Sequence, residues 1–146
     1  MSPSWSVATL ALDLEGTLIS NAVSQFPRPG LHAFLEFCRE RVPQLVIYTA
    51  VNEARFRDVA RRLADEGSAP EWFETLPHLQ CTGQYKDLRF IEGAEVPTTL
   101  LLDDLESYVH PEQREQWIRI APFEAPYADD DRELVRVMAL LGRHSA

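Results

Sequence analysis

The sequence of 146 residues contains only two cysteines and no apolar run long enough to cross a membrane. Cys38 and Cys81 lie far apart and lack metal-binding spacing, so we expect reduced thiols rather than a disulfide framework. The amino terminus carries neither a basic leader nor a long apolar stretch, so the cytoplasm is the expected location. Repeats, low-complexity segments and long linkers are missing too. We therefore expect one domain over residues 1–146, with no membrane association.

Positive charge is also scarce. The chain has 14 lysines and arginines against 23 aspartates and glutamates, which gives a formal net charge of -9. This balance argues against a nucleic-acid backbone as the main partner, because binding to phosphates requires clustered positive charge. A metal ion, in contrast, is readily bound among carboxylates. The hydrophobic content of 45% is enough to fill a core without outside help.

Strand-like and helix-like segments alternate along the chain. Apolar runs predict strands at residues 7–12, 44–49 and 98–102, with two weaker strands at 79–82 and 117–120. Helical spacing of apolar residues predicts helices after Pro29-Gly30, across 56–63 and across 134–141, and Gly67 ends the second. This order predicts an α/β fold, a Rossmann-like doubly wound parallel sheet with flanking helices. Ligands of such folds bind at the carboxyl ends of the strands.

Residues 13–17 read Asp-Leu-Glu-Gly-Thr and directly follow the first apolar run. A strand that ends here suits phosphoryl transfer, in which Asp13 attacks phosphorus and Glu15 exchanges a proton with the leaving oxygen. Side chains at i and i+2 share a direction only in an extended chain, so Glu15 must turn in from a loop. Gly16 permits such a turn. For this segment alone, the alternative is an aspartate that caps a turn.

Polar side chains also end the second and third predicted strands, namely Thr49, and Asp103 with Asp104. Taken singly, Thr49 is typical of a helix cap, and the acidic pair is typical of a solvated turn. Because parallel strands end at one edge, we expect these groups to converge with Asp13 and Glu15. Several carboxylates in one crevice repel each other unless a cation lies between them. Mg²⁺, a hard ion that takes oxygen ligands, is the predicted cofactor.

With these residues in view, the sequence resembles the haloacid-dehalogenase superfamily of phosphatases. The closest similarity is to the nuclear LIM interactor-interacting factor phosphatases, which include small phosphatases of the RNA polymerase II carboxyl-terminal domain. The resemblance extends from about Leu10 to Leu141. Besides residues 13–17, it rests on Arg28-Pro29-Gly30, Tyr48-Thr49-Ala50, residues 83–88 (Gly-Gln-Tyr-Lys-Asp-Leu), Leu102-Asp103-Asp104 and Ser107-Tyr108-Val109.

The resemblance implies a magnesium-dependent phosphomonoester hydrolase that acts through an aspartyl phosphate. Asp13 is then the nucleophile, and Glu15 is the general acid and base, whose backbone carbonyl also binds Mg²⁺. Asp104, with Asp103, completes the metal site. The short chain implies no large cap domain.

The resemblance also assigns the phosphate contacts. Thr49, Ala50 and Lys86 are expected to hold phosphate oxygens, with Lys86 as a point charge that balances the carboxylates. Taken alone, Lys86 is more typical of a surface lysine.

Glu15 departs from the aspartate that this family normally carries. The extra methylene moves the carboxyl group by about 1.5 Å, and a misplacement of about 1 Å costs about 100-fold in rate. Enolase-phosphatases of the same superfamily also carry Asp-x-Glu-Gly-Thr, so we expect an active enzyme. A catalytically inactive phosphate-binding module is the alternative.

Without a cap, the crevice is expected to be open and to admit a phosphorylated protein side chain. Sugar phosphates and other small phosphomonoesters are the alternative substrates. Two features have open roles. Trp72 and Phe73, in an irregular stretch at residues 68–85, either help to bind substrate or pack against the fold. A run of arginines either forms a basic patch near phosphate or solvates a helix face: Arg55, Arg57, Arg61 and Arg62.

Overall fold

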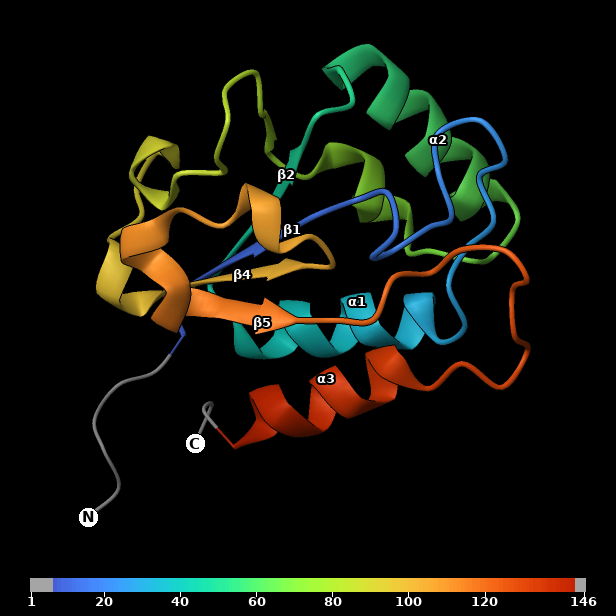
Figure 1. The fold of residues 1–146 in the computed structure, drawn as a ribbon. Coiled ribbons are helices and arrows are strands. Elements are labelled where there is room, and N and C mark those ends of the chain that lie inside the picture. The colour runs from blue at the N-terminus through green and yellow to red at the C-terminus, as the bar shows by residue number, and fades with distance from the viewer. Residues whose placement is uncertain (1–6, 144–146) are drawn as a thin grey trace.

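The computed structural model describes residues 7–143, so both ends of the predicted 1–146 domain, including the amino-terminal stretch behind the expected cytoplasmic location, lie outside it. The described chain forms a five-stranded, all-parallel sheet in the order β3-β2-β1-β4-β5 (Figure 1). Each predicted strand is present, with shifts of one or two residues at some ends. The strands are β1 (Thr9–Leu12), β2 (Gln44–Thr49), β3 (His78–Gln80), β4 (Thr99–Asp103) and β5 (Trp117–Arg119).

The α-helices cover one face of the sheet. They are α1 (Leu31–Arg41), α2 (Glu53–Asp65) and α3 (Glu133–Gly142), and their apolar stripes join the strands in one hydrophobic core. Figure 1 shows α1 and α3 side by side beneath the sheet. Between residues 7 and 143, no helix is both long and apolar enough to cross a membrane.

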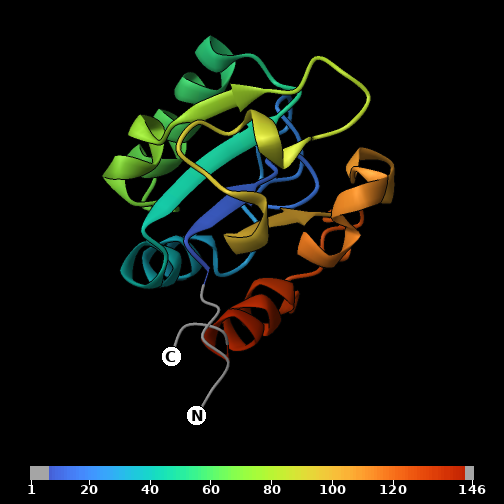
Figure 2. The same ribbon diagram turned by 90° about the vertical axis from the view of Figure 1, so that its left-hand side faces the viewer.

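The opposite face is covered by the segment that runs from β3 through β4 to β5. Its elements are short 3-10 turns: η2 (Leu88–Phe90), η3 (Val96–Thr98), η4 (Glu106–Tyr108) and η5 (Pro111–Gln116). Figure 2 shows the yellow part of this segment passing over the sheet on the viewer's side. The second layer of the doubly wound fold is therefore built from turns, because its apolar residues do not recur at helical spacing over a whole helix.

The winding direction changes at β1, which pairs with β2 on one side and with β4 on the other. In this register Leu12 lies opposite both Ile47 and Leu102. The residues that follow these three therefore reach the same edge of the sheet at the same level. Ligand sites in open α/β sheets lie at such a change of direction.

The irregular stretch that contains Trp72 and Phe73 serves packing. It forms a 3-10 turn, η1 (Glu71–Thr75), and Phe73 is fully buried with its ring 5.4 Å from that of Phe56. Trp72 packs against the core and lies 4.4 Å from the guanidinium of Arg39, in the last turn of α1. The last turn of α1 precedes the start of β2, at the edge opposite the strand ends. The structure therefore favours the packing role for this pair.

Candidate active site

Three carboxylates gather where β1 and β4 end. Asp13 follows β1 and is 6% exposed, Asp103 ends β4 and is fully buried, and Asp104 is half-buried. One oxygen from each lies within 4.8 Å of the others. The sequence analysis predicts that carboxylates at the strand ends converge, and the structure brings these three together.

Lys86 lies between two of these carboxylates. Its Nζ is 2.7 Å from Oδ1 of Asp13 and 2.6 Å from Oδ2 of Asp103, and the side chain is only 1% exposed. The Lys86 backbone N–H donates to the Tyr108 carbonyl at 2.8 Å, which fixes the chain at this position. Although burial lowers the pKa of Lys86, the two carboxylates raise it above its usual value. Lys86 is therefore a charged group inside the site and does not lie on the surface.

The loop after β1 adds a hydroxyl to the cluster. Gly16 has a φ of 78°, the left-handed conformation that glycine adopts without strain, and this turns the chain as predicted. The Thr17 hydroxyl donates to Oδ2 of Asp13 at 2.7 Å and lies 3.3 Å from Oδ1 of Asp104. Thr17 belongs to the motif, but sequence reasoning gave it no role of its own.

The carboxylates are electrostatically unfavourable as they stand. Burial, against the opposing effect of Lys86, raises the pKa of Asp13 to about 6. Burial and the neighbouring carboxylate also raise the pKa values of Asp103 and Asp104. A divalent cation would relieve this repulsion, and the donors are the carboxylate oxygens that Mg²⁺ takes. The Glu15 carbonyl accepts no hydrogen bond from the described residues, so its oxygen is available as a further ligand. The residues present therefore fit a cation.

The Glu15 carboxylate is held by the loop that follows the motif. Its Oε2 accepts a hydrogen bond of 2.7 Å from the backbone N–H of Ala22. The group of clustered metal-ligating side chains does not include it. Glu15 is therefore positioned by the backbone of the following loop, whereas Asp13 is positioned by Thr17 and Lys86.

Thr49 and Ala50 lie at the end of β2, beside β1. Thr49 is buried, and its Oγ1 accepts a hydrogen bond of 3.1 Å from the Val51 N–H. This contact orients the oxygen, and among residues 7–143 the hydroxyl proton makes no hydrogen bond. Ala50 is exposed. The cap of α2 is Asn52, whose side chain accepts from Arg55 N–H, so Thr49 does not cap this helix.

A buried arginine, Arg28, holds the loop that follows β1 through its backbone carbonyls. Arg28 donates to the carbonyls of Gly16 and Thr17, at 3.3 Å each, and pairs with Asp131 at 3.0 Å. Phe123 N–H also donates to the Gly16 carbonyl at 2.8 Å. The Arg-Pro-Gly motif marked Arg28 without assigning it a contact. Nothing local in the sequence links Asp131 to it.

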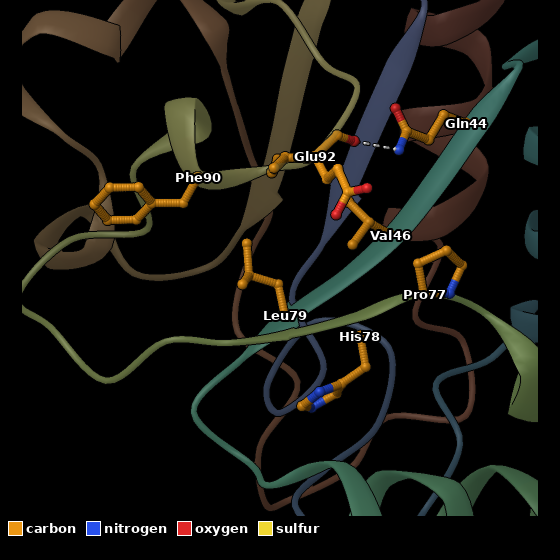
Figure 3. A pocket seen from close by; sticks show the side chains of 8 residues that line it. Gln44, Val46, Pro77, His78, Leu79, Phe90 and Glu92 are labelled. Atoms are coloured by element: carbon orange, nitrogen blue, oxygen red, sulfur yellow. Dashed lines mark hydrogen bonds between the residues drawn. The ribbon is translucent and has the colours of Figure 1, made fainter.

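A cavity of about 420 Å³ lies elsewhere, beside the start of β2 and the edge strand β3. Figure 3 shows Val46, Leu79 and Phe90 around it, and the hydrogen bond from Gln44 to the Glu92 carbonyl. None of the predicted site residues lines this cavity. The charged cluster, rather than this hollow, is the candidate active site.

The comparison with protein families agrees with the fold. The family model of NLI interacting factor-like phosphatases matches residues 8–146. The chain belongs to this family, as its sequence motifs indicated, and the family supports phosphatase activity in general. No curated protein matches the chain.

Proposed function

We propose that the protein is a magnesium-dependent phosphomonoester hydrolase that acts through an aspartyl phosphate. One observation carries the proposal. The Asp13 carboxylate, at the end of β1, is contacted by Lys86 and Thr17 and lies within 4.8 Å of Asp103 and Asp104 oxygens. A buried carboxylate with this support is suited to be a nucleophile, because its position is fixed before substrate arrives.

Asp13 attacks phosphorus in the first step, and the bond between phosphorus and the leaving oxygen breaks. Glu15 gives that oxygen a proton. In the second step Glu15 takes a proton from water, which attacks the phosphorus of the aspartyl phosphate and releases inorganic phosphate and free Asp13. Each oxygen of Asp13 already accepts one hydrogen bond and keeps a second lone pair for reaction.

Thr49, Ala50 and Lys86 hold the oxygens of the phosphoryl group. The Thr49 hydroxyl has its oxygen fixed by Val51 N–H, so its proton is available for a phosphate oxygen. Lys86 supplies a positive charge that is buried and therefore weakly screened. This charge opposes the negative charge that accumulates on the transferring group.

Asp13, Asp104 and the Glu15 carbonyl would hold Mg²⁺ directly. A bound Mg²⁺ polarises the phosphoryl oxygens and neutralises charge. Asp103 is fully buried and accepts hydrogen bonds from Lys86 and the Leu105 N–H, so it would complete the site chiefly by holding Lys86 in place. Asp104 is half-buried and keeps lone pairs for a ligand bond, because its contact with the Thr17 hydroxyl is long, at 3.3 Å.

A phosphorylated protein is the proposed substrate class. Between residues 7 and 143 every strand belongs to one sheet, and no second sheet stands over the strand ends. A small phosphomonoester is the alternative, and a panel of phosphopeptides and metabolites separates the two.

A catalytically inactive phosphate-binding module is the second candidate. The position of Glu15 favours it: its carboxylate lies outside the acidic cluster, and the protein would only bind phosphate if the longer side chain fails to reach the leaving oxygen.

The deciding experiment measures phosphoenzyme formation in single turnover with two aryl phosphates of different leaving-group basicity. Asp13→Asn should abolish turnover and leave the fold intact, since an amide is a poor nucleophile of nearly the same shape. Glu15→Gln should slow the basic leaving group by about 100-fold or more and the good leaving group much less. Turnover by Asp13→Asn would reject the mechanism. Phosphate binding without turnover in the unmodified protein would establish the module instead.

A further inference from the structure

Two of the four arginines on α2 turn toward the loop that holds Glu15. Arg55 and Arg62 are seven residues apart, two helical turns, and share one face of the helix. Arg57 and Arg61 lie on another face, where Arg57 donates to the Glu74 and Leu76 carbonyls and Arg61 pairs with Glu74. The arginine run therefore divides into two sets with different partners.

Both arginines of the first set lead to one atom, the carbonyl oxygen of Ala22. Arg55 Nη2 donates to it directly at 2.7 Å. Arg62 Nη1 donates to Oε1 of Gln25 at 3.0 Å, and Gln25 Nε2 donates to the same Ala22 oxygen at 3.0 Å. Ala22 in turn donates its N–H to Glu15 at 2.7 Å. We call Arg55, Arg62, Gln25, Ala22 and Glu15 the Ala22 network.

The backbone at Gln25 supports this reading of the loop. Gln25 has a φ of 58°, a left-handed conformation that is uncommon outside glycine. Its N–H donates to the Asn21 carbonyl at 2.8 Å, which closes the turn. A residue other than glycine keeps this backbone conformation where surrounding contacts hold it, and the contacts of the Gln25 side chain with Arg62 and Ala22 do so.

We propose that Arg55 and Arg62 are positioning residues that set the place of the Glu15 carboxylate through Ala22. The proposal rests on the assignment of Glu15 as proton donor under Proposed function. Glu15 carries one methylene more than aspartate, so it needs a fixed partner if its carboxyl group is to stay in reach of the leaving oxygen. The Ala22 N–H is that partner, and Arg55 and Arg62 of α2 fix the position of Ala22 through its carbonyl oxygen.

The kinetic test compares Arg55→Gln, Arg62→Gln and the double variant, with Arg61→Gln as the matched control. Arg61 and Arg62 are neighbours with similarly exposed side chains, 59% and 57%. The measured quantity is the ratio of single-turnover rates on aryl phosphates with good and poor leaving groups. The double variant should lower the rate on the poor leaving group by about 10-fold relative to the good one. Arg61→Gln should leave the ratio unchanged.

A purely structural role or direct binding of substrate by Arg55 gives a different result. Both would change rates or KM equally for the two leaving groups, and this outcome would overturn the proposal. In a Glu15→Gln background, adding Arg55→Gln should not change the ratio further, because the positioned group is gone. Melting temperatures within about 3 °C of the unmodified protein establish that the variants are folded.

A second readout does not depend on activity. The short hydrogen bond to a carboxylate should shift the Ala22 amide proton downfield in the NMR spectrum, and Glu15→Gln should reduce this shift. Arg55→Gln and the double variant should move the resonance in the same direction, while Arg61→Gln should not. An unmoved Ala22 resonance in both would overturn the positioning role. Absence of phosphatase activity in the unmodified protein would reject the proposed function alone, because the NMR result stands without it.

Discussion

Arg28 and Asp131 form a two-armed ion pair between segments 103 positions apart in the chain. Nε and Nη2 of Arg28 each lie 3.0 Å from one oxygen of Asp131. The Arg28 side chain is fully buried, and that of Asp131 is 15% exposed. Since Arg28 also donates to the carbonyls of Gly16 and Thr17, this pair connects the segment before α3 to the loop that follows β1.

Loss of Asp131 should destabilise the fold. Asp131→Ala leaves a buried guanidinium without its counter-charge, so we expect the free energy of unfolding to fall by about 3 kcal/mol. Urea denaturation followed by circular dichroism measures this. Asp130 is exposed beside it, and Asp130→Ala should change stability by no more than about 0.5 kcal/mol. Equal effects of the two substitutions would contradict the role given to the ion pair.

Gly16 and Gly67 allow strain and steric conflict to be separated. Both have a φ of 78°, so alanine at either position should cost about 1 kcal/mol of stability. A Cβ at Gly16 would lie 2.5 Å from Oδ2 of Asp104, whereas a Cβ at Gly67 meets nothing within 4 Å. Gly16→Ala should therefore also displace Asp104 and sharply lower phosphatase activity. Gly67→Ala should keep full activity; if both variants lost it equally, the steric argument would fail.

Asp103 and Asp104 should respond differently to removal. Asp104→Ala should raise the Mg²⁺ concentration needed for half-maximal activity by about 10-fold or more, with little change in stability. Asp103→Ala should destabilise the fold by about 3 kcal/mol, because Lys86 loses a buried partner 2.6 Å away. Magnesium titration and urea denaturation of both variants provide the comparison. The reverse pattern would exchange the roles of the two carboxylates.

Asp87 should make the fold acid-sensitive. Hydrogen bonds from Arg89 and, to a smaller extent, Gln113 hold the pKa of Asp87 below its usual range. A carboxyl group with a lowered folded-state pKa adds stability above its unfolded pKa of about 4 and loses it as the pH falls further. Asp87→Asn should therefore lower the free energy of unfolding by about 2 kcal/mol at pH 7. The difference should shrink at pH values below about 4. A difference that stays constant with pH would contradict this account.

Much of the fold is encoded locally. The apolar run Gln44–Thr49 has the same bounds in the structure as in the sequence prediction, because a parallel strand buried on both faces carries a continuous apolar run. The carboxylates at the strand ends follow from the same logic. Once Asp13 and Asp103 are read as the ends of parallel strands, the shared edge brings them together without further information.

The partners of buried charges are decided only in three dimensions. Lys86 lies 73 positions from Asp13 in the chain and 17 from Asp103, and local composition predicts a surface lysine there. The arginines of α2 likewise form one basic run in the sequence, yet in the structure Arg55 donates to the Ala22 carbonyl and Arg61 pairs with Glu74. Apolar periodicity records which face of an element is buried. It carries no record of which distant group neutralises a buried charge, because that pairing depends on where the chain returns after folding.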